Sequence, residues 1–140
     1  DTIPQGNIFR ELLSRYFISS PTMMIRKSLL DELGGYDESL AYEDFDFWVR
    51  SAPRTRYAYL PEALVRRRVL PSSMGKLQYK LNSKQVLSTL AVCRKALVLC
   101  GSPEDFGALR KRLSYEFRQA LRVANFPLAW AYVTLWRKAR

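Results

Sequence analysis

The sequence contains no histidine and only two cysteines, Cys93 and Cys100. Zinc sites are formed mainly by these two residue types, so their scarcity excludes a zinc site. The two cysteines lie in a segment with helical periodicity, where seven residues rise about 10.5 Å, too far for a disulfide within one helix. We therefore expect both thiols to be small core residues, as is usual in a reducing compartment.

Long apolar runs and targeting signals are also missing. No run of about 18 uninterrupted apolar residues occurs, so the sequence predicts no transmembrane helix. The start of the chain, residues 1–5, has neither an initiator methionine nor a basic stretch followed by an apolar one. We expect the chain to be a fragment cut from a longer protein.

Acidic residues are scarce in the second half of the chain. Residues 76–140 hold thirteen Lys/Arg against three Asp/Glu, whereas residues 1–75 hold ten of each, so the second half carries the whole net charge of +10. Such a basic region fits a nucleic-acid surface, a contact with an anionic membrane, or a solvated helical face. No nucleic-acid-binding motif is recognisable, and we therefore expect no nucleic-acid partner.

What the sequence does contain is enough apolar material for one folded core, with 48% hydrophobic and 13% aromatic residues. Periodicity predicts a first region that mixes strands and helices and a second region that is helical. The predicted strands are residues 22–26, 56–60 and 63–69. The predicted helices include residues 7–17, 27–33, 78–99, 103–125 and 127–137. The helix at 103–125 has a strong start signal, Ser102-Pro103-Glu104-Asp105.

The most distinctive segment is residues 42–50, Y-E-D-F-D-F-W-V-R. Glu43, Asp44 and Asp46 fall within four positions and alternate with aromatic residues. A carboxylate beside apolar rings loses water, which can raise its pKa and produce a general base at neutral pH. Two purely structural roles suit the same residues: acids in a first helical turn complement the helix dipole, and Asp46 with Arg50 is an ordinary i,i+4 pair.

The order of motifs around this segment resembles that of the family 2 glycosyltransferases, over residues 7–75. The motifs are P-T-M-M-I-R-K, G-G-Y-D-E-S-L, E-D-F-D-F-W-V-R and R-R-R-V-L-P-S-S, in that order. The resemblance implies an α/β fold. Residues 1–75 would be the C-terminal portion of a GT-A (nucleotide-diphospho-sugar transferase) fold, and residues 76–140 an α-helical extension. It also implies an inverting transfer of a sugar to a hydroxyl acceptor.

The resemblance carries over to single residues on the acceptor side. Asp44 takes the position of the general base that deprotonates the acceptor hydroxyl. Glu43, Thr22 and Trp48 take acceptor-side positions, although Thr22 also suits a core strand and Trp48 also suits core packing. Asp46 matches a second acid, and we expect it to be structural through Arg50.

On the donor side, the resemblance assigns the diphosphate to Arg68, Ser72 and Ser73. A guanidinium matches phosphate oxygens well, but an arginine-rich edge strand would also deter unwanted strand pairing. The sequence departs from the family pattern nearby, because Arg67 replaces a tyrosine and Leu70 replaces a histidine. The missing histidine puts a contribution of this loop to a metal site in doubt.

Asp44-Phe45-Asp46 has the form D-x-D, yet we assign no metal ligand to it. The family's metal-binding D-x-D ends a strand in a preceding half of the domain, which we expect to lie outside this chain. We therefore expect a divalent metal, Mg or Mn, in the full-length enzyme and none bound by this fragment, which should be inactive alone.

The implied partners are a nucleotide-diphospho-sugar donor and a carbohydrate or lipid-linked acceptor, as in cell-envelope polysaccharide biosynthesis. The implied location is cytoplasmic, with peripheral contact at the inner face of the membrane through the basic helices. The alternative is a non-catalytic binding module whose basic helices dock an anionic membrane or polymer.

Overall fold

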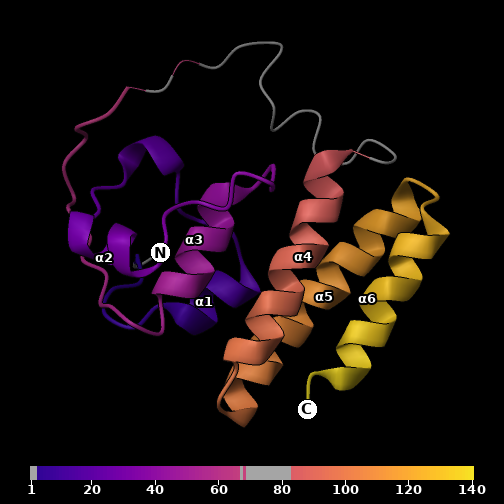
Figure 1. Cartoon of the computed structure of the whole chain (residues 1–140). Helices are drawn as coiled ribbons and strands as arrows, with labels where there is room; N and C mark the ends of the chain where they lie inside the picture. Colours follow the sequence, from indigo (N-terminus) through magenta and orange to yellow (C-terminus); the bar gives the residue numbers. More distant parts are fainter. Residues whose placement is uncertain (1–2, 67, 69–82) are drawn as a thin grey trace.

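The computed structural model describes residues 3–66, 68 and 83–140, and every regular element in these residues is helical. Figure 1 shows α4, α5 and α6 side by side, with the shorter helices α1, α2 and α3 gathered next to them. In chain order the elements are α1 (Phe9–Ser14), the 3-10 helix η1 (Ser20–Thr22), α2 (Lys27–Glu32), α3 (Glu43–Ser51), α4 (Lys84–Leu99), α5 (Pro103–Arg122) and α6 (Phe126–Lys138).

The predicted α/β fold, and with it the GT-A portion, is wrong: the described residues contain no strand or sheet. Strands were expected at 22–26, 56–60 and 63–69, but the described parts of these segments are the end of η1 and irregular backbone. The single trace of pairing is an isolated antiparallel bridge between Gly6 and Tyr57, with N···O distances of 2.7 and 2.8 Å.

The absence of a sheet from this part of the chain has a physical cause. A strand is stable only when neighbouring strands pair its backbone groups and another layer covers one of its faces. Leu60 and Leu64 are 64% and 70% exposed, so no such layer covers them, although Met23, Ile25 and Tyr57 pack partly against the core. Apolar residues alone therefore could not produce a strand here.

The second region contains three helices, as predicted, although α4 begins at Lys84 and residues 78–82 of its predicted range lie outside the described residues. The caps explain where α5 and α6 begin. Ser102 and Asp105 form a capping box, each side chain accepting a hydrogen bond from the backbone N–H of the other, and Pro103 occupies the first turn of α5. Asn125 starts α6 by accepting a hydrogen bond from the N–H of Leu128 at 3.2 Å. These helices therefore begin where the sequence places a capping side chain.

One hydrophobic core spans the two halves of the chain. Helix α1 packs against α5 and α3, α3 packs against α4, and α5 packs against α6. Leu12 of α1, Trp48 of α3 and Leu109 of α5 are all fully buried. Arg10 of α1 also donates a hydrogen bond to Asp105 at 2.9 Å, beside the start of α5. The basic helices are thus packed onto the segment that carries the acidic motif.

Among the described residues, none of the helices combines the length and apolar character needed to span a bilayer.

Candidate functional site

Asp44 lies in the first turn of α3 with a half-buried side chain. Its Oδ2 accepts a hydrogen bond from Tyr16 Oη at 2.9 Å, and its Oδ1 accepts one from the backbone N–H of Phe45 at 2.6 Å. A carboxylate offers about four lone-pair positions, so two acceptor positions remain for a further donor. The carboxylate is therefore held in place and still able to accept a proton.

Tyr16 belongs to the site although no sequence pattern marks it. Its ring packs on Trp48 and Phe45, with centroid distances of 5.3 and 5.9 Å, which fixes the phenol beside Asp44. Burial raises the pKa of Tyr16 far above its usual value, and the negative charge of Asp44 raises it further. Tyr16 consequently keeps its proton at any physiological pH and remains a donor to Asp44.

Glu43 precedes Asp44 in the first turn of α3, and Tyr36 lies in the segment that joins α2 to α3. The pKa of Tyr36 is raised mainly by burial and also by the negative charges of Asp44 and Glu43. The Tyr36 ring packs against Phe47 at 5.1 Å and is 39% exposed. Glu43 forms no hydrogen bond with the described residues. Two partly exposed tyrosines thus flank an acidic pair.

The turn before α3 places Tyr36. Gly34 and Gly35 both adopt a positive φ, 71° and 73°, which ends α2. The N–H of Gly35 donates to the carbonyl of Leu30 at 2.8 Å and closes the turn. A side chain at either glycine would have to adopt a strained backbone conformation.

Asp46 has a different role from Asp44, because it is completely buried. Arg50 donates to its Oδ2 at 2.7 Å and Lys95, from α4, donates to its Oδ1 at 2.8 Å. Arg50 also donates to the backbone carbonyls of Leu33 and Gly35. The prediction that Asp46 is structural through Arg50 is therefore confirmed.

Lys95 was not anticipated as part of this arrangement. It also donates to Oδ2 of Asp37 at 2.7 Å, so one ammonium group joins α4 to both α3 and the turn after α2. This hydrogen bond is the main reason why the pKa of Asp37 falls to about 2. Burial lowers the pKa of Lys95, but the hydrogen bonds to Asp37 and Asp46 outweigh it and raise the pKa overall.

A second buried ion pair lies behind Phe45. Arg112 of α5 places its guanidinium over the Phe45 ring at 5.0 Å and donates to Glu116 at 3.3 Å. It also donates to the carbonyl of Leu13. Burial raises the pKa of Glu116, although the charge of Arg112 opposes that rise. Phe45, the residue after Asp44, is thus covered by a guanidinium of α5 that is itself hydrogen-bonded to α1.

Thr22 lines an apolar groove of about 610 Å³ rather than contacting Asp44. Most of its lining comes from within residues 17–26 and 55–65, and Phe47 of α3 also lines it. The Thr22 hydroxyl donates to the carbonyl of Ser19 at 2.6 Å. Met24, beside it, is 98% exposed. The groove reaches α3 at Phe47, three residues after Asp44.

The remaining predicted site residues differ in where they lie. Trp48 is 0% exposed, so it supports Tyr16 from within the core. Arg68 is exposed and makes no hydrogen bond or ion pair with the other described residues. Ser72 and Ser73 lie outside the described residues. No contact within the described part of the chain joins the predicted donor-side residues to Asp44.

The D-x-D form of residues 44–46 does not fit a metal ion. Both oxygens of Asp46 are already hydrogen-bonded to Arg50 and Lys95, and the side chain has no access to solvent. Across residues 3–66, 68 and 83–140, no group of three or more Asp, Glu, Cys or His side chains is placed to hold a metal. The expectation of a divalent metal in the full-length enzyme stays a prediction.

Comparison with known proteins bears on this cluster. Searches of curated proteins and of solved structures each found no match. The sequence profile of the family described as "Glycosyltransferase like family 2" matches residues 3–100, which include both Asp44 and its partner Tyr16. The match covers well over half of the chain and confirms the resemblance expected from the motifs. The chain therefore belongs to this glycosyltransferase-like family, and its general chemistry is glycosyl transfer.

Proposed function

We propose that the chain carries the acceptor side of a sugar-transfer site in which Asp44 is the general base. The acceptor hydroxyl attacks the anomeric carbon of a nucleotide-diphospho-sugar, and its proton passes to Asp44. The new bond joins the acceptor oxygen to the anomeric carbon. The bond from that carbon to the diphosphate breaks on the opposite face, so the configuration inverts and the nucleoside diphosphate leaves.

The observation that carries this proposal is the contrast among the three acids of the motif. Asp46 is fully buried and has an ion pair on each oxygen, so it cannot receive a proton from a substrate. Glu43 is accessible but makes no hydrogen bond within the described part of the chain that would orient it. Asp44 alone is both accessible and fixed, by Tyr16 and by the Phe45 N–H.

The surroundings of Asp44 suit this role. Tyr16 orients the carboxylate, and the rings of Tyr16, Phe45 and Trp48 keep water away from one side of it. Glu43 and the exposed edge of Tyr36 are the groups next to Asp44 that an acceptor sugar would meet. An aromatic face can pack against the apolar face of a sugar ring, and a carboxylate can accept its hydroxyl groups.

The other predicted residues take supporting or donor-side roles in the proposal. Trp48 supports the acceptor side through Tyr16, and Thr22 lies along the groove that would receive a more distant part of the acceptor. Arg68, with Ser72 and Ser73, would bind the donor diphosphate. The exposed position of Arg68 leaves its guanidinium available for a phosphate.

The test is Asp44→Asn in the full-length enzyme, with Glu43→Gln as the matched control one residue away. Loss of a general base costs about 10²–10⁴-fold in rate. We expect Asp44→Asn to lose sugar transfer by this factor while donor binding, followed by calorimetry, changes little. Glu43→Gln should mainly raise the KM for the acceptor. Transfer by Asp44→Asn within threefold of the wild-type rate would remove Asp44 from the mechanism.

A further inference from the structure

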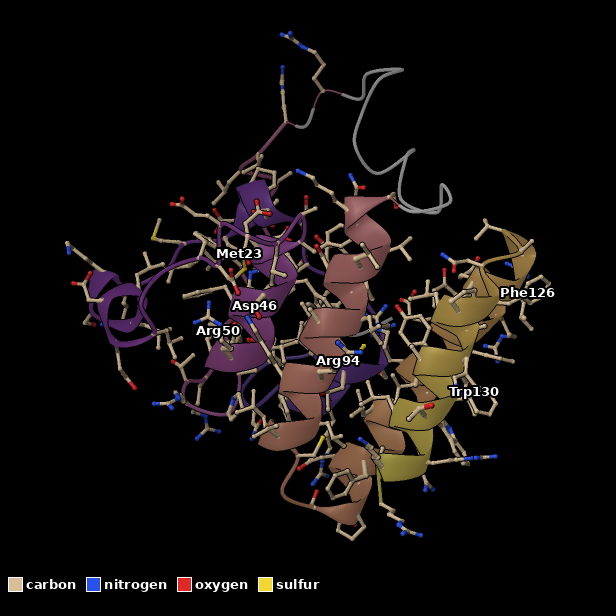
Figure 2. The ribbon with its side chains drawn as sticks, turned by 45° about the vertical axis from the view of Figure 1, so that its right-hand side comes forward. Met23, Asp46, Arg50, Arg94, Phe126 and Trp130 are labelled. Carbon is tan, nitrogen blue, oxygen red and sulfur yellow. The ribbon has the colours of Figure 1, made fainter. Side chains whose placement is uncertain are left out.

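The four aromatic residues of α6 do not share one environment. Tyr132 is 1% exposed and belongs to the core, whereas Phe126, Trp130 and Trp136 are 66%, 65% and 40% exposed. Figure 2 shows Phe126 and Trp130 on the outward side of α6, away from α4. Large aromatic side chains that face solvent on one helix need an explanation, because burying them would be favourable.

Cations accompany these rings. Phe126, Trp130 and Arg137 follow spacings of four and seven residues, which place them on one side of α6. The Arg137 guanidinium lies 6.0 Å from the centre of the Trp130 ring, and that of Arg110, from α5, lies 4.4 Å from the centre of the Trp136 ring. We refer to Phe126, Trp130, Trp136, Arg110 and Arg137 as the aromatic–basic face.

Almost no negative charge opposes this face on its own two helices. From residue 106 to residue 140 the sequence contains a single acid, Glu116, among many Lys and Arg residues. Glu116 is 4% exposed and paired with the buried Arg112, so its charge is compensated inside the core. The acids at the start of α5, Glu104 and Asp105, form ion pairs with Arg10. The outward surface of α5 and α6 is consequently cationic.

We propose that the aromatic–basic face docks onto the surface of an anionic lipid bilayer, with Phe126 and Trp130 at the level of the headgroups. Tryptophan favours this level because its ring is apolar and its N–H is polar, and arginine beside it can pair with lipid phosphate. Cations near an anionic surface add attraction that salt screens. The helix would lie along the surface.

The chemistry of the face favours a bilayer over a nucleic acid. A phosphate backbone would be bound by the cations and would gain nothing from Phe126, whose ring lies at the start of α6 beside Pro127. The exposed Leu121, near the end of α5, adds to the apolar surface around that corner. Apolar groups mixed with cations match an interface that offers both acyl chains and phosphates.

Co-sedimentation of the 140-residue chain with lipid vesicles tests the proposal without depending on any enzymatic activity. We expect binding to phosphatidylcholine vesicles that contain phosphatidylglycerol, little binding to phosphatidylcholine alone, and release by salt. Tryptophan emission should shift to shorter wavelength on binding and be quenched by brominated lipids. The shift would come from Trp130 and Trp136, because Trp48 is already fully buried.

Matched variants locate the contact. Phe126→Ser with Trp130→Ser should weaken vesicle binding by at least about tenfold. Arg137→Gln with Lys138→Gln should weaken it about fivefold per cation. The control is Val98→Ser with Arg94→Gln, which should leave vesicle binding unchanged. These two residues are an exposed apolar residue and an exposed cation on α4, and Figure 2 labels Arg94. Circular dichroism verifies that each variant is folded.

Three outcomes would overturn the proposal. The first is no sedimentation with anionic vesicles at low salt. The second is vesicle binding that Phe126→Ser with Trp130→Ser leaves intact, because binding through charge alone would not depend on these aromatic side chains. The third is binding to DNA as strong as that to vesicles, with no shift in tryptophan emission, which would identify a nucleic-acid surface.

Discussion

Tyr16 donates a hydrogen bond from its phenol to Oδ2 of Asp44, across 2.9 Å and 28 positions of sequence. The pKa of Tyr16 is raised by burial and by the charge of Asp44, so the phenol stays protonated and the carboxylate always has this donor. In the proposed mechanism, Tyr16 is therefore a positioning residue that acts through Asp44.

Removing this hydroxyl should therefore slow transfer more than it weakens binding. For Tyr16→Phe in the full-length enzyme we expect kcat to fall about 5–30-fold, because a hydrogen bond to a charged group contributes about 1–2 kcal/mol when it is partly exposed. KM for the donor should stay within about twofold. A fall in thermal stability with kcat unchanged would indicate a purely structural role.

Asp46 and Asp31 form ion pairs of nearly equal length but very different burial. Asp46 accepts from Arg50 at 2.7 Å with 0% side-chain exposure, whereas Asp31 accepts from Lys27 at 2.8 Å with 63% exposure. We expect Asp46→Asn to lower the free energy of unfolding by about 3–5 kcal/mol, because two cations lose a buried partner. Asp31→Asn should cost less than about 0.5 kcal/mol. Urea unfolding measures both, and equal values would contradict this assignment.

The pair of Asp37 and Lys95 predicts a particular acid sensitivity. The pKa of Asp37 is lowered from 3.8 to about 2, mainly by the hydrogen bond from Lys95. A lowered pKa means that the folded state favours the charged carboxylate. Its contribution to stability is therefore complete above about pH 4 and is lost as pH falls towards 2.

The measurement is the urea midpoint from about pH 5 to about pH 2, for the wild type and for Asp37→Asn. We expect the variant to be less stable at the upper end of this range and the difference to shrink as pH falls. A difference that stays constant across the range would show that ionisation of Asp37 does not contribute.

Arg68 and Arg66 are both exposed and stand two positions apart, so they form a matched pair for the donor side. The proposed function has Arg68 bind the donor diphosphate, and a charge-assisted phosphate contact contributes about 1.5–3 kcal/mol. Arg68→Ala in the full-length enzyme should weaken donor binding in calorimetry by about 10–150-fold. Arg66→Ala should have a much smaller effect. Equal donor affinity in wild type and Arg68→Ala would exclude the contact.

Helix positions could be predicted from the sequence where a capping residue and a periodic pattern coincide. Ser102 with Asp105, and the pair Gly34-Gly35, determine helix ends by local hydrogen bonding, so short-range reasoning suffices. The strand at 56–60 failed because a strand depends on distant partners, and Tyr57 pairs only with Gly6 in the described chain. Pattern alone does not reveal whether such partners exist.

In the candidate site, too, local contacts could be predicted from the sequence and distant contacts could not. The structural pair of Asp46 with Arg50 was predicted, because it rests on spacing within one helix. The role of Asp44 follows from the family resemblance and stays a prediction. Tyr16 and Lys95 were missed, because their contacts with α3 span 28 and 49 positions. Neither residue stands in a pattern that marks it, since a tyrosine among apolar neighbours and a lysine in a basic helix are common.

The packing of α1 on α5 has a consequence for how the chain reaches its native state. Leu12 and Leu13 are fully buried, yet α5 begins far along the chain, at Pro103. During synthesis from the N-terminus, these leucines stay without their main partner until residue 122 has emerged. Such long-range contacts slow folding and expose apolar surface in the meantime. The family-matched stretch 3–100 therefore completes the packing of its own first helix only after the residues beyond it have been made.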